Sequence, residues 1–104
     1  MSDYDILVVP ITWLDGLSHG AANGYVGVPE GHSLHGKTYM DEDFPELGVH
    51  GGVTFTGTRD DGIVGDESWW YIGFDTAHLD DDILSWPIEA VKEEAEYLRD
   101  QIET

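Results

Sequence analysis

Two short segments in which apolar and polar residues alternate constrain the fold of this chain most. They are VHGGVTFT (49–56) and WWYIGFD (69–75), and this alternation is typical of β-strands with one buried face. The apolar positions are Val49, Val53 and Phe55 in the first segment, and Trp70, Ile72 and Phe74 in the second. The intervening loop contains the turn dipeptides DG and GD, so the pattern predicts an antiparallel hairpin with a long loop.

The register of this hairpin is predicted from side-chain parity. Both apolar faces must meet the same core, and a shift by one residue would turn one of them outward. With the turn centred near residues 62 and 63, the pairs expected on the buried face are Val53–Ile72 and Phe55–Trp70. The pairs expected on the other face are Thr56–Trp69, Thr54–Tyr71, Gly52–Gly73 and His50–Asp75. Adjacent Trp69 and Trp70 therefore face opposite sides of the sheet.

The less apolar face of the hairpin is a candidate small-ligand site. Its expected binding residues are Gly52, Trp69, Tyr71 and Gly73, which would form a floor of bare backbone beside an aromatic wall. His50 and Asp75 would lie about 5 Å apart at Cβ, within reach of a hydrogen bond. A carboxylate fixes the tautomer of a neighbouring imidazole, as a general base requires. An ordinary surface pair, with a bulge at the glycines, is the alternative interpretation.

The candidate catalytic residues are His50, Asp75 and His78, and the same three are the candidate metal ligands. His32 or His35, from the Gly- and His-rich segment 29–37, could complete a site for a divalent metal. The spacing is weak evidence, because the sequence has neither an HExxH nor a paired CxxC motif. The cofactor is therefore left open.

Several other chemistries are excluded or weakly supported by the sequence. The chain has no cysteine, which excludes disulfides, thiolate metal sites and thiol nucleophiles. It has neither a GxSxG elbow nor the GK[ST] ending of a phosphate-binding loop. The acidic run Asp80–Asp82 is interpreted as a solvated loop, with a weak cation site as the alternative.

The C-terminal stretch 87–103 predicts an amphipathic helix. Its apolar residues recur at spacings of three and four, at Ile88, Val91, Ala95, Leu98 and Ile102. Ser85 is a candidate N-cap. Further strands are expected at 4–14 and 24–28. Residues 1–104 are thus predicted to form a single α+β domain, a small antiparallel sheet of about four strands with one C-terminal helix packed on it.

Acidic residues dominate the charge of the chain. It has 22 Asp and Glu against 4 Lys and Arg, a net charge of −18. Such a chain lacks the cations that bind nucleic-acid phosphates or an anionic membrane surface. Its 12% aromatic content, in periodic segments, argues against disorder. Because salt shortens the Debye length to about 3 Å at 1 M, the composition indicates a halophilic source and a high-salt cytoplasm. A DNA mimic is the alternative.

Neither a membrane span nor a signal peptide is expected. The sequence has no apolar run of the length needed to cross a bilayer. The N-terminus also lacks a basic region ahead of an apolar stretch.

Three ordered blocks resemble an uncharacterised small protein family of tailed bacteriophages. The blocks are GYVGVPEGHSLHGKTY (24–39), VHGGVTFTG (49–57) and WWYIGFDTAHLDD (69–81). The chain departs from the family pattern at Ser33, where proline is expected, and at Asp80, where glycine is common. The resemblance implies a viral or proviral origin without an established activity. It implies functional polar positions at His32, Lys37, His50, Asp75 and His78.

Three functions follow as hypotheses. The first is an accessory protein that binds a small polar ligand such as a nucleotide-like signal, with Tyr71 or Trp69 stacking on a ring and Lys37 and His32 beside it. The second is a compact hydrolase or lyase with His50 as base, oriented by Asp75. The third is an acidic protein-interaction or DNA-mimic protein. A protein partner or a homo-oligomer fits each of them.

Overall fold

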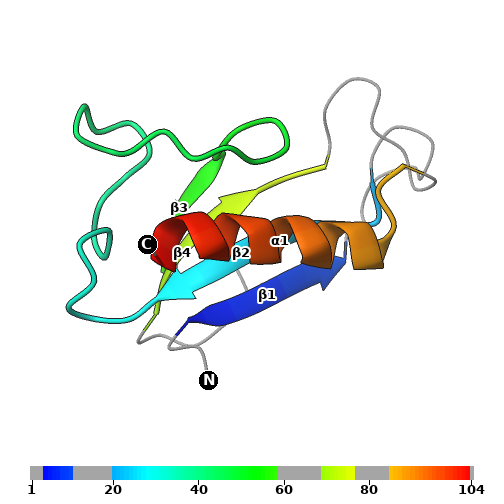
Figure 1. The fold of residues 1–104 in the computed structure, drawn as a ribbon, viewed down its shortest axis with the longest axis horizontal. Helices are drawn as coiled ribbons and strands as arrows, with labels where there is room; N and C mark the ends of the chain where they lie inside the picture. The colour runs from blue at the N-terminus through cyan, green and yellow to red at the C-terminus, as the bar shows by residue number, and fades with distance from the viewer. Residues whose placement is uncertain (1–3, 11–19, 59–68, 77–84, 104) are drawn as a thin grey trace.

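The computed structural model describes residues 4–10, 20–58, 69–76 and 85–103. Its elements are β1 (Asp5–Pro10), β2 (Ala22–Val28), β3 (Phe55–Gly57), β4 (Trp70–Phe74) and α1 (Ile88–Glu103). The strands form one antiparallel sheet in the order β1-β2-β4-β3, and α1 lies along one face of it (Figure 1). The predicted α+β class, with a C-terminal helix on a four-stranded sheet, is confirmed.

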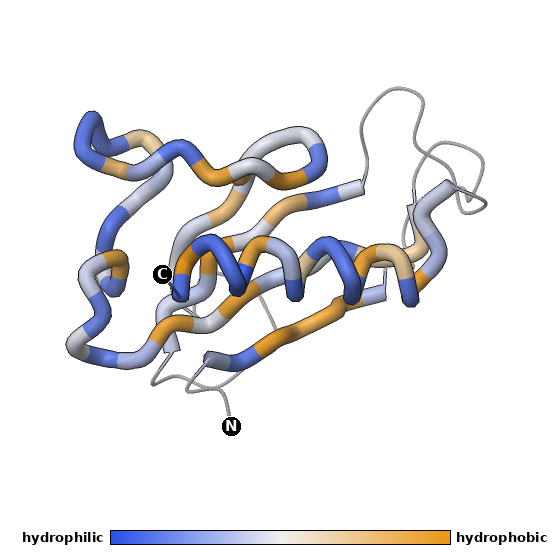
Figure 2. Tube along the Cα trace, viewed as in Figure 1, coloured by the Kyte–Doolittle hydropathy of each residue, from blue (hydrophilic) through white to orange (hydrophobic). Residues whose placement is uncertain are grey.

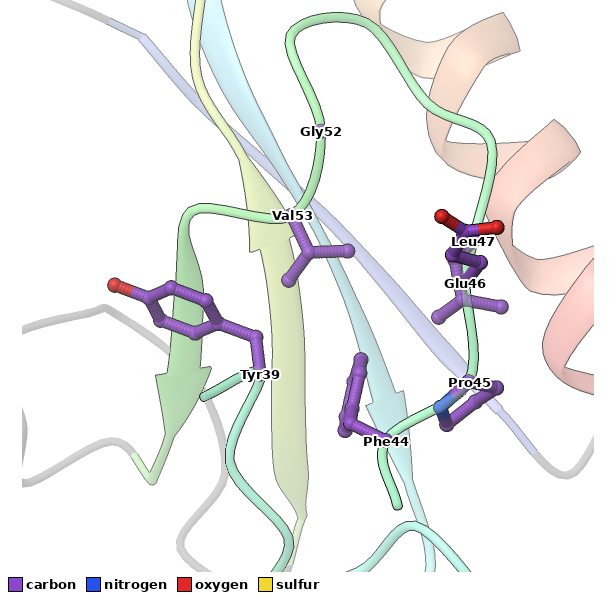
Figure 3. Close-up of a pocket in the computed structure, with 7 residues that line it drawn as sticks. All are labelled: Tyr39, Phe44, Pro45, Glu46, Leu47, Gly52 and Val53. Atoms are coloured by element: carbon purple, nitrogen blue, oxygen red, sulfur yellow. The ribbon is translucent and has the colours of Figure 1, made fainter. Parts of the chain in front are cut away.

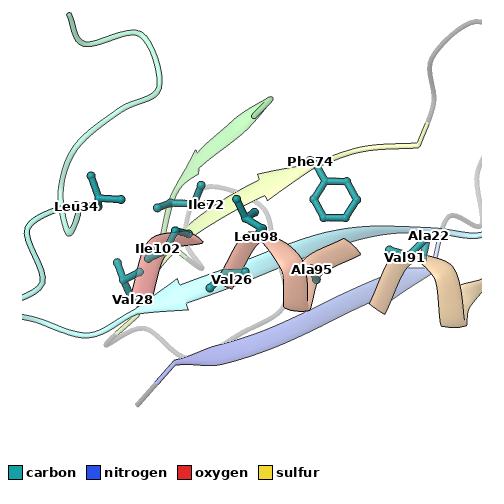
Figure 4. Packing of buried hydrophobic residues seen from close by; sticks show 10 residues of the cluster. All are labelled: Ala22, Val26, Val28, Leu34, Ile72, Phe74, Val91, Ala95, Leu98 and Ile102. Carbon is teal, nitrogen blue, oxygen red and sulfur yellow. The ribbon is translucent and has the colours of Figure 1, made fainter. Parts of the chain in front are cut away.

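The core lies between α1 and the sheet. The buried helix residues are Val91, Ala95, Leu98 and Ile102, four of the five positions of the predicted stripe. They pack against buried side chains of β2 and β4 and against Leu34 (Figure 4). Removing a valine, leucine or isoleucine side chain of this core from water stabilises the fold by roughly 1.5–3 kcal/mol. Ile88, in the first turn of the helix, is instead 49% exposed. Figure 2 shows the two-sided hydropathy of α1 along its length.

The ends of two elements differ from the predicted ones. The Pro87 carbonyl accepts a hydrogen bond from the Val91 N–H at 3.1 Å, so Pro87 and not Ser85 occupies the N-cap position of α1. Strand β2 begins at Ala22 because Ala22 and Asn23 pair with the last residues of β1. The predicted extension of the first strand beyond residue 10 lies outside the described residues.

The predicted register between the third and fourth strands is wrong. Strand β3 begins only at Phe55, and the observed partners are Phe55–Gly73, Thr56–Ile72 and Gly57–Tyr71. The N–H of Thr54 also donates to the Gly73 carbonyl, at 2.9 Å. Two residues of the chain thus oppose Gly73, which is the arrangement of a β-bulge.

The bulge explains why side-chain parity failed. Val49 and Val53 pack against the core, as predicted. The extra residue before Phe55 reverses the alternation, so the Phe55 side chain lies on the face of the sheet away from α1. There its ring meets that of Tyr25 edge to face, with centroids 5.5 Å apart.

Residues 29–54, between β2 and β3, run alongside α1 (Figure 1). Hydrogen bonds at three of its residues hold this segment to the helix. The Glu94 carboxylate accepts from the His50 N–H at 2.7 Å, Gln101 bonds to Gly48, and His32 bonds to Ile102. In the described part of the chain, no helix is long and apolar enough to cross a bilayer.

Candidate functional site

His50, the predicted general base, is not a cross-strand neighbour of Asp75. It lies in a turn before β3 begins, and its backbone N–H is bonded to Glu94. Its imidazole lies against the indole of Trp86, with ring centroids 4.1 Å apart and planes inclined by 37°. The predicted ladder pairing is therefore wrong, because the bulge and the shortness of β3 end the pairing before residue 50. The catalytic role of His50, Asp75 and His78 stays a prediction, and His78 lies outside the described residues.

The predicted glycine floor is not formed. Gly52 is not paired with Gly73; it lies in a turn with a φ of +81°, and its N–H donates to the Val49 carbonyl at 2.8 Å. The ring of Tyr25 covers Gly73, because a Cβ added there would lie 2.3 Å from Tyr25 Cδ2. The glycine at position 73 therefore makes room for an aromatic ring of the protein itself and offers no bare surface to a ligand.

The predicted aromatic wall is also differently placed. Tyr71 is fully buried, and its hydroxyl donates to Asp5 Oδ2 at 2.8 Å, so its ring is not available for stacking. Trp69 is half-buried beside Gly27. Trp70 packs against the core as predicted, and its indole N–H donates to the Lys37 carbonyl at 2.9 Å.

His32 has two structural hydrogen bonds. Its Nδ1 accepts from the Leu34 N–H at 3.0 Å, which leaves the proton on Nε2. Nε2 then donates to the Ile102 carbonyl at 3.2 Å, in the last turn of α1. This bond satisfies one of the carbonyls that a helix leaves unpaired at its C-terminus. His32 therefore links the Gly- and His-rich segment to the helix.

Lys37, the predicted anchor for an anionic group, forms an exposed ion pair with Asp43. The hydrogen bond and charge of Asp43 raise the pKa of Lys37, and Lys37 in turn lowers the pKa of Asp43. The ammonium group is thus already engaged by a carboxylate of the same segment.

A metal centre is not assembled in the described part of the chain. No three His, Asp or Glu side chains gather there in a way that could hold a metal ion.

Asp75, another predicted site residue, is half-buried. Burial raises the pKa of the Tyr25 phenol, and the negative charge of Asp75 raises it further. His78 and Asp80–Asp82 lie outside the described residues.

The structure offers another candidate site, a hollow of about 340 Å³ that we call the first hollow. Its lining residues are Tyr39, Phe44, Pro45, Glu46, Leu47, Gly52 and Val53. Figure 3 shows Val53 and Phe44 between Tyr39 on one side and Pro45 to Leu47 on the other. The volume is at the lower end of the roughly 300–1,000 Å³ typical of small-molecule sites. Of the predicted ligand-binding residues, Gly52 alone lines this hollow.

The walls of the first hollow are fixed at both ends. Gly48, next to Leu47, exchanges two hydrogen bonds with the side-chain amide of Gln101. On the other side, the Tyr39 N–H donates to Thr56 Oγ1 at 3.3 Å. Between them, the Phe44 N–H bonds to the Asp41 carbonyl at 3.1 Å. The cavity walls are therefore tied to α1 and to β3, which favours a preformed site.

The surroundings of the first hollow are negatively charged. Asp41, Glu42, Asp43 and Glu46 are all exposed. Of the described residues that line the hollow, Glu46 is the one that carries a charge. Such a site attracts cations and repels anions.

A second hollow adjoins the first and has a volume of about 220 Å³. Its lining residues are His32, Ser33, Leu34, Pro45, Leu47, Gln101 and Ile102. Pro45 and Leu47 line both hollows, so the two hollows lie next to each other at these residues.

Both hollows were missed in the sequence because segment 38–48 reads as an acidic connection. The available signal was the apolar residues within that acidic run, Tyr39, Phe44 and Leu47. Their packing partners in α1 and β3 are distant in sequence, so no local pattern indicates that they share a cavity.

Comparisons with known proteins give no relative. No protein-family model matches this chain, and no curated protein or solved structure is significantly similar to it.

Proposed function

We propose that this protein is a binding module whose ligand site is the first hollow. The observation that carries the proposal is the lining of that hollow. Half-buried Phe44, Leu47 and Val53 form apolar walls, and the carboxylate-bearing Glu46 lies beside them. Apolar walls with few polar groups are the usual composition of a ligand pocket, in which the polar groups fix orientation. The ligand is a small molecule or side chain with an apolar body and a cationic group.

Charge argues against an anionic ligand such as a nucleotide. The ammonium of Lys37, the cation of this segment, is paired with Asp43. Among the described residues that line the first hollow, a phosphate would meet the carboxylate of Glu46 and no cationic side chain. In place of the nucleotide-like ligand suggested by the sequence, we therefore propose a cationic ligand with an aromatic or aliphatic body.

Phenethylamine and phenylacetate provide a matched test, because they share an aromatic body and carry opposite charges. In NMR titrations, phenethylamine should shift the signals of Leu47 and Val53, and phenylacetate should bind at least about tenfold more weakly. Glu46→Gln should weaken phenethylamine binding several-fold. Glu42→Gln removes the same charge from the same exposed segment outside the hollow, so it should have a smaller effect. Shifts that are confined to other surfaces would refute the proposal.

We further propose that the protein acts in the high-salt cytoplasm of a halophilic host, as an accessory protein of viral or proviral origin. The support is the net charge of −18 on 104 residues and the three family-like sequence blocks. Mutual repulsion among the carboxylates opposes folding at low salt, and screening relieves it. The midpoint of thermal unfolding should therefore rise steadily with KCl up to molar concentrations. A midpoint that is insensitive to salt would contradict this proposal.

A further inference from the structure

We infer that the natural occupant of the first hollow is part of a basic polypeptide. An extended segment of this partner would lie across Pro45 and Leu47 and insert one apolar side chain into each hollow. This inference rests on the proposed function, because it assigns a partner to the same site. It goes further by using the second hollow and the exposed apolar residues beside the first.

The two hollows suit an extended segment better than a single small molecule. They have Pro45 and Leu47 in common, and the second, at about 220 Å³, is smaller than a typical small-molecule pocket. In an extended chain, side chains at positions i and i+2 point to the same side and lie roughly 6.5–7 Å apart. Two such side chains would enter the adjacent hollows, and the backbone between them would pass over Pro45 and Leu47.

Exposed apolar side chains extend the surface beyond the first hollow. Tyr39 is 43% exposed, and its neighbour Met40 is 81% exposed. A small ligand inside the hollow would leave Met40 in water. Tyrosine and methionine are enriched at protein interfaces, and methionine adapts its shape to a partner. The two residues therefore favour a partner larger than a small molecule.

Charge decides between a basic partner and a second copy of this chain. Asp41, Glu42 and Glu46 are exposed on the same segment as the apolar surface, Glu46 at the first hollow itself, and Lys37 is paired with Asp43. A second copy would bring equivalent carboxylates against these, and like charges brought together in an interface oppose association. Lysine or arginine residues that flank the two anchors would instead meet carboxylates of opposite charge.

The salt concentration sets how much of the peptide affinity comes from apolar contacts and how much from charge. At about 1 M salt the Debye length is near 3 Å, so long-range attraction is screened and only contacting charges contribute. The apolar anchors then supply most of the affinity, which is consistent with two hollows and exposed Met40. At low salt, the full acidic surface adds long-range attraction to the same contacts.

The test uses capped peptides titrated into the full chain at about 0.15 M and about 2 M KCl, followed by NMR and calorimetry. The peptide KFKLK carries two apolar anchors at i and i+2 between lysines. It should bind at least about tenfold more tightly than phenethylamine, and it should shift the signals of Met40, Leu47 and Ser33. The peptides KSKSK, which lacks the anchors, and EFELE, which reverses the charge, should each bind at least about tenfold more weakly than KFKLK at both salt concentrations.

A variant in the second hollow separates the inference from the proposed function. Ser33 is exposed and lines only the second hollow, so Ser33→Trp should fill it without disturbing the core. This change should weaken KFKLK binding about tenfold and leave phenethylamine binding unchanged, whereas Ser33→Ala should alter neither. Met40→Ser should weaken KFKLK alone.

The outcomes that overturn the inference are distinct from those that overturn the proposed function. If phenethylamine binds in the first hollow and KFKLK binds no more tightly, the inference fails and the binding module stands. Equal binding of KSKSK would show nonspecific capture of cations by the acidic surface, and would also overturn the inference. A dimer in sedimentation velocity that Met40→Ser abolishes would identify a second copy as the occupant. If neither probe binds in the hollows, both proposals fail.

Discussion

The side-chain amide of Gln101 is bonded to both polar groups of Gly48. Its Oε1 accepts from the Gly48 N–H, and its Nε2 donates to the Gly48 carbonyl, each at 2.7 Å. The pair joins the last turns of α1 to the segment that carries Phe44 and Leu47. A half-buried glutamine on the helix thereby positions one wall of the first hollow.

Gln101→Ala should loosen this wall. The loss of the two hydrogen bonds to Gly48, and of the longer one from Nε2 to the Tyr97 carbonyl, should lower the free energy of unfolding by about 1 kcal/mol. Phenethylamine binding should also weaken, although the protein stays folded, because the loosened wall must become ordered when the ligand binds. Urea denaturation and titration measure the two effects. Asp100→Ala, at the exposed neighbouring position, is the control and should change binding little. Equal affinity in wild type and Gln101→Ala would show that the wall is held by packing alone.

Gly73→Ala should destabilise the protein strongly. The added methyl group would lie 2.3 Å from Tyr25 Cδ2 and 3.1 Å from the Gly24 carbonyl oxygen, so the ring and the backbone of β2 would have to move. Overpacking of this kind typically costs about 1–3 kcal/mol. Gly48→Ala is the matched control, because its nearest atoms are 3.5 Å away at an ordinary van der Waals distance. In the background Tyr25→Ala, the cost of Gly73→Ala should fall, and an unchanged cost would contradict the contact.

Ionisation of the Tyr25 phenol should destabilise the fold at high pH. Burial raises its pKa above the ordinary value of 10.0, a hydrogen bond with Asn23 lowers it, and the charge of Asp75 raises it. Because the folded pKa is the higher one, the unfolded chain loses this proton first. The contribution of Tyr25 is complete below pH 10 and is lost as the pH rises through the folded pKa.

Tyr25→Phe should therefore flatten the decline of unfolding free energy with pH above about pH 10, measured by urea denaturation at constant salt. Tyr97→Phe is the control, since Tyr97 is 54% exposed. Equal slopes in wild type and Tyr25→Phe would show that other groups cause the decline.

His32→Ala should fray the end of α1. The change removes the acceptor of the Leu34 N–H and the donor to the Ile102 carbonyl. The loss should be about 1–2 kcal/mol, and amide exchange should accelerate at Leu34 and in the last turn of the helix. His35→Ala, which removes a ring near Trp70 at a centroid distance of 6.0 Å, should leave the Leu34 amide protected. Unchanged exchange in His32→Ala would exclude the bridging role.

Local periodicity was a sufficient guide to the helix and to the fold class. The stripe Val91, Ala95, Leu98 and Ile102 is buried as its spacing indicates, because a helix repeats the same face every three to four residues wherever it packs. The alternation in 70–74 similarly identified β4 and the core side of Trp70. These features depend on residues close in sequence.

The candidate site depended on contacts that no local pattern contains. One extra residue at Thr54 places the Phe55 side chain on the opposite face of the sheet from the predicted one. It also interrupts the ladder that would have paired His50 with Asp75. Parity assumes an uninterrupted ladder, so a single bulge is enough to overturn it.

The sequence by itself determined the elements, the buried stripe of the helix and the acidic surface, because each follows from neighbouring residues or from composition. Only the tertiary structure decided which polar and aromatic groups bind one another inside the fold and which surface stays open. The Tyr71 hydroxyl, for example, donates a hydrogen bond to Asp5. The physical reason is that the hollows form where parts of residues 29–54 are held against one another and against α1, through hydrogen bonds such as that between Gly48 and Gln101, whose partners lie far apart along the chain.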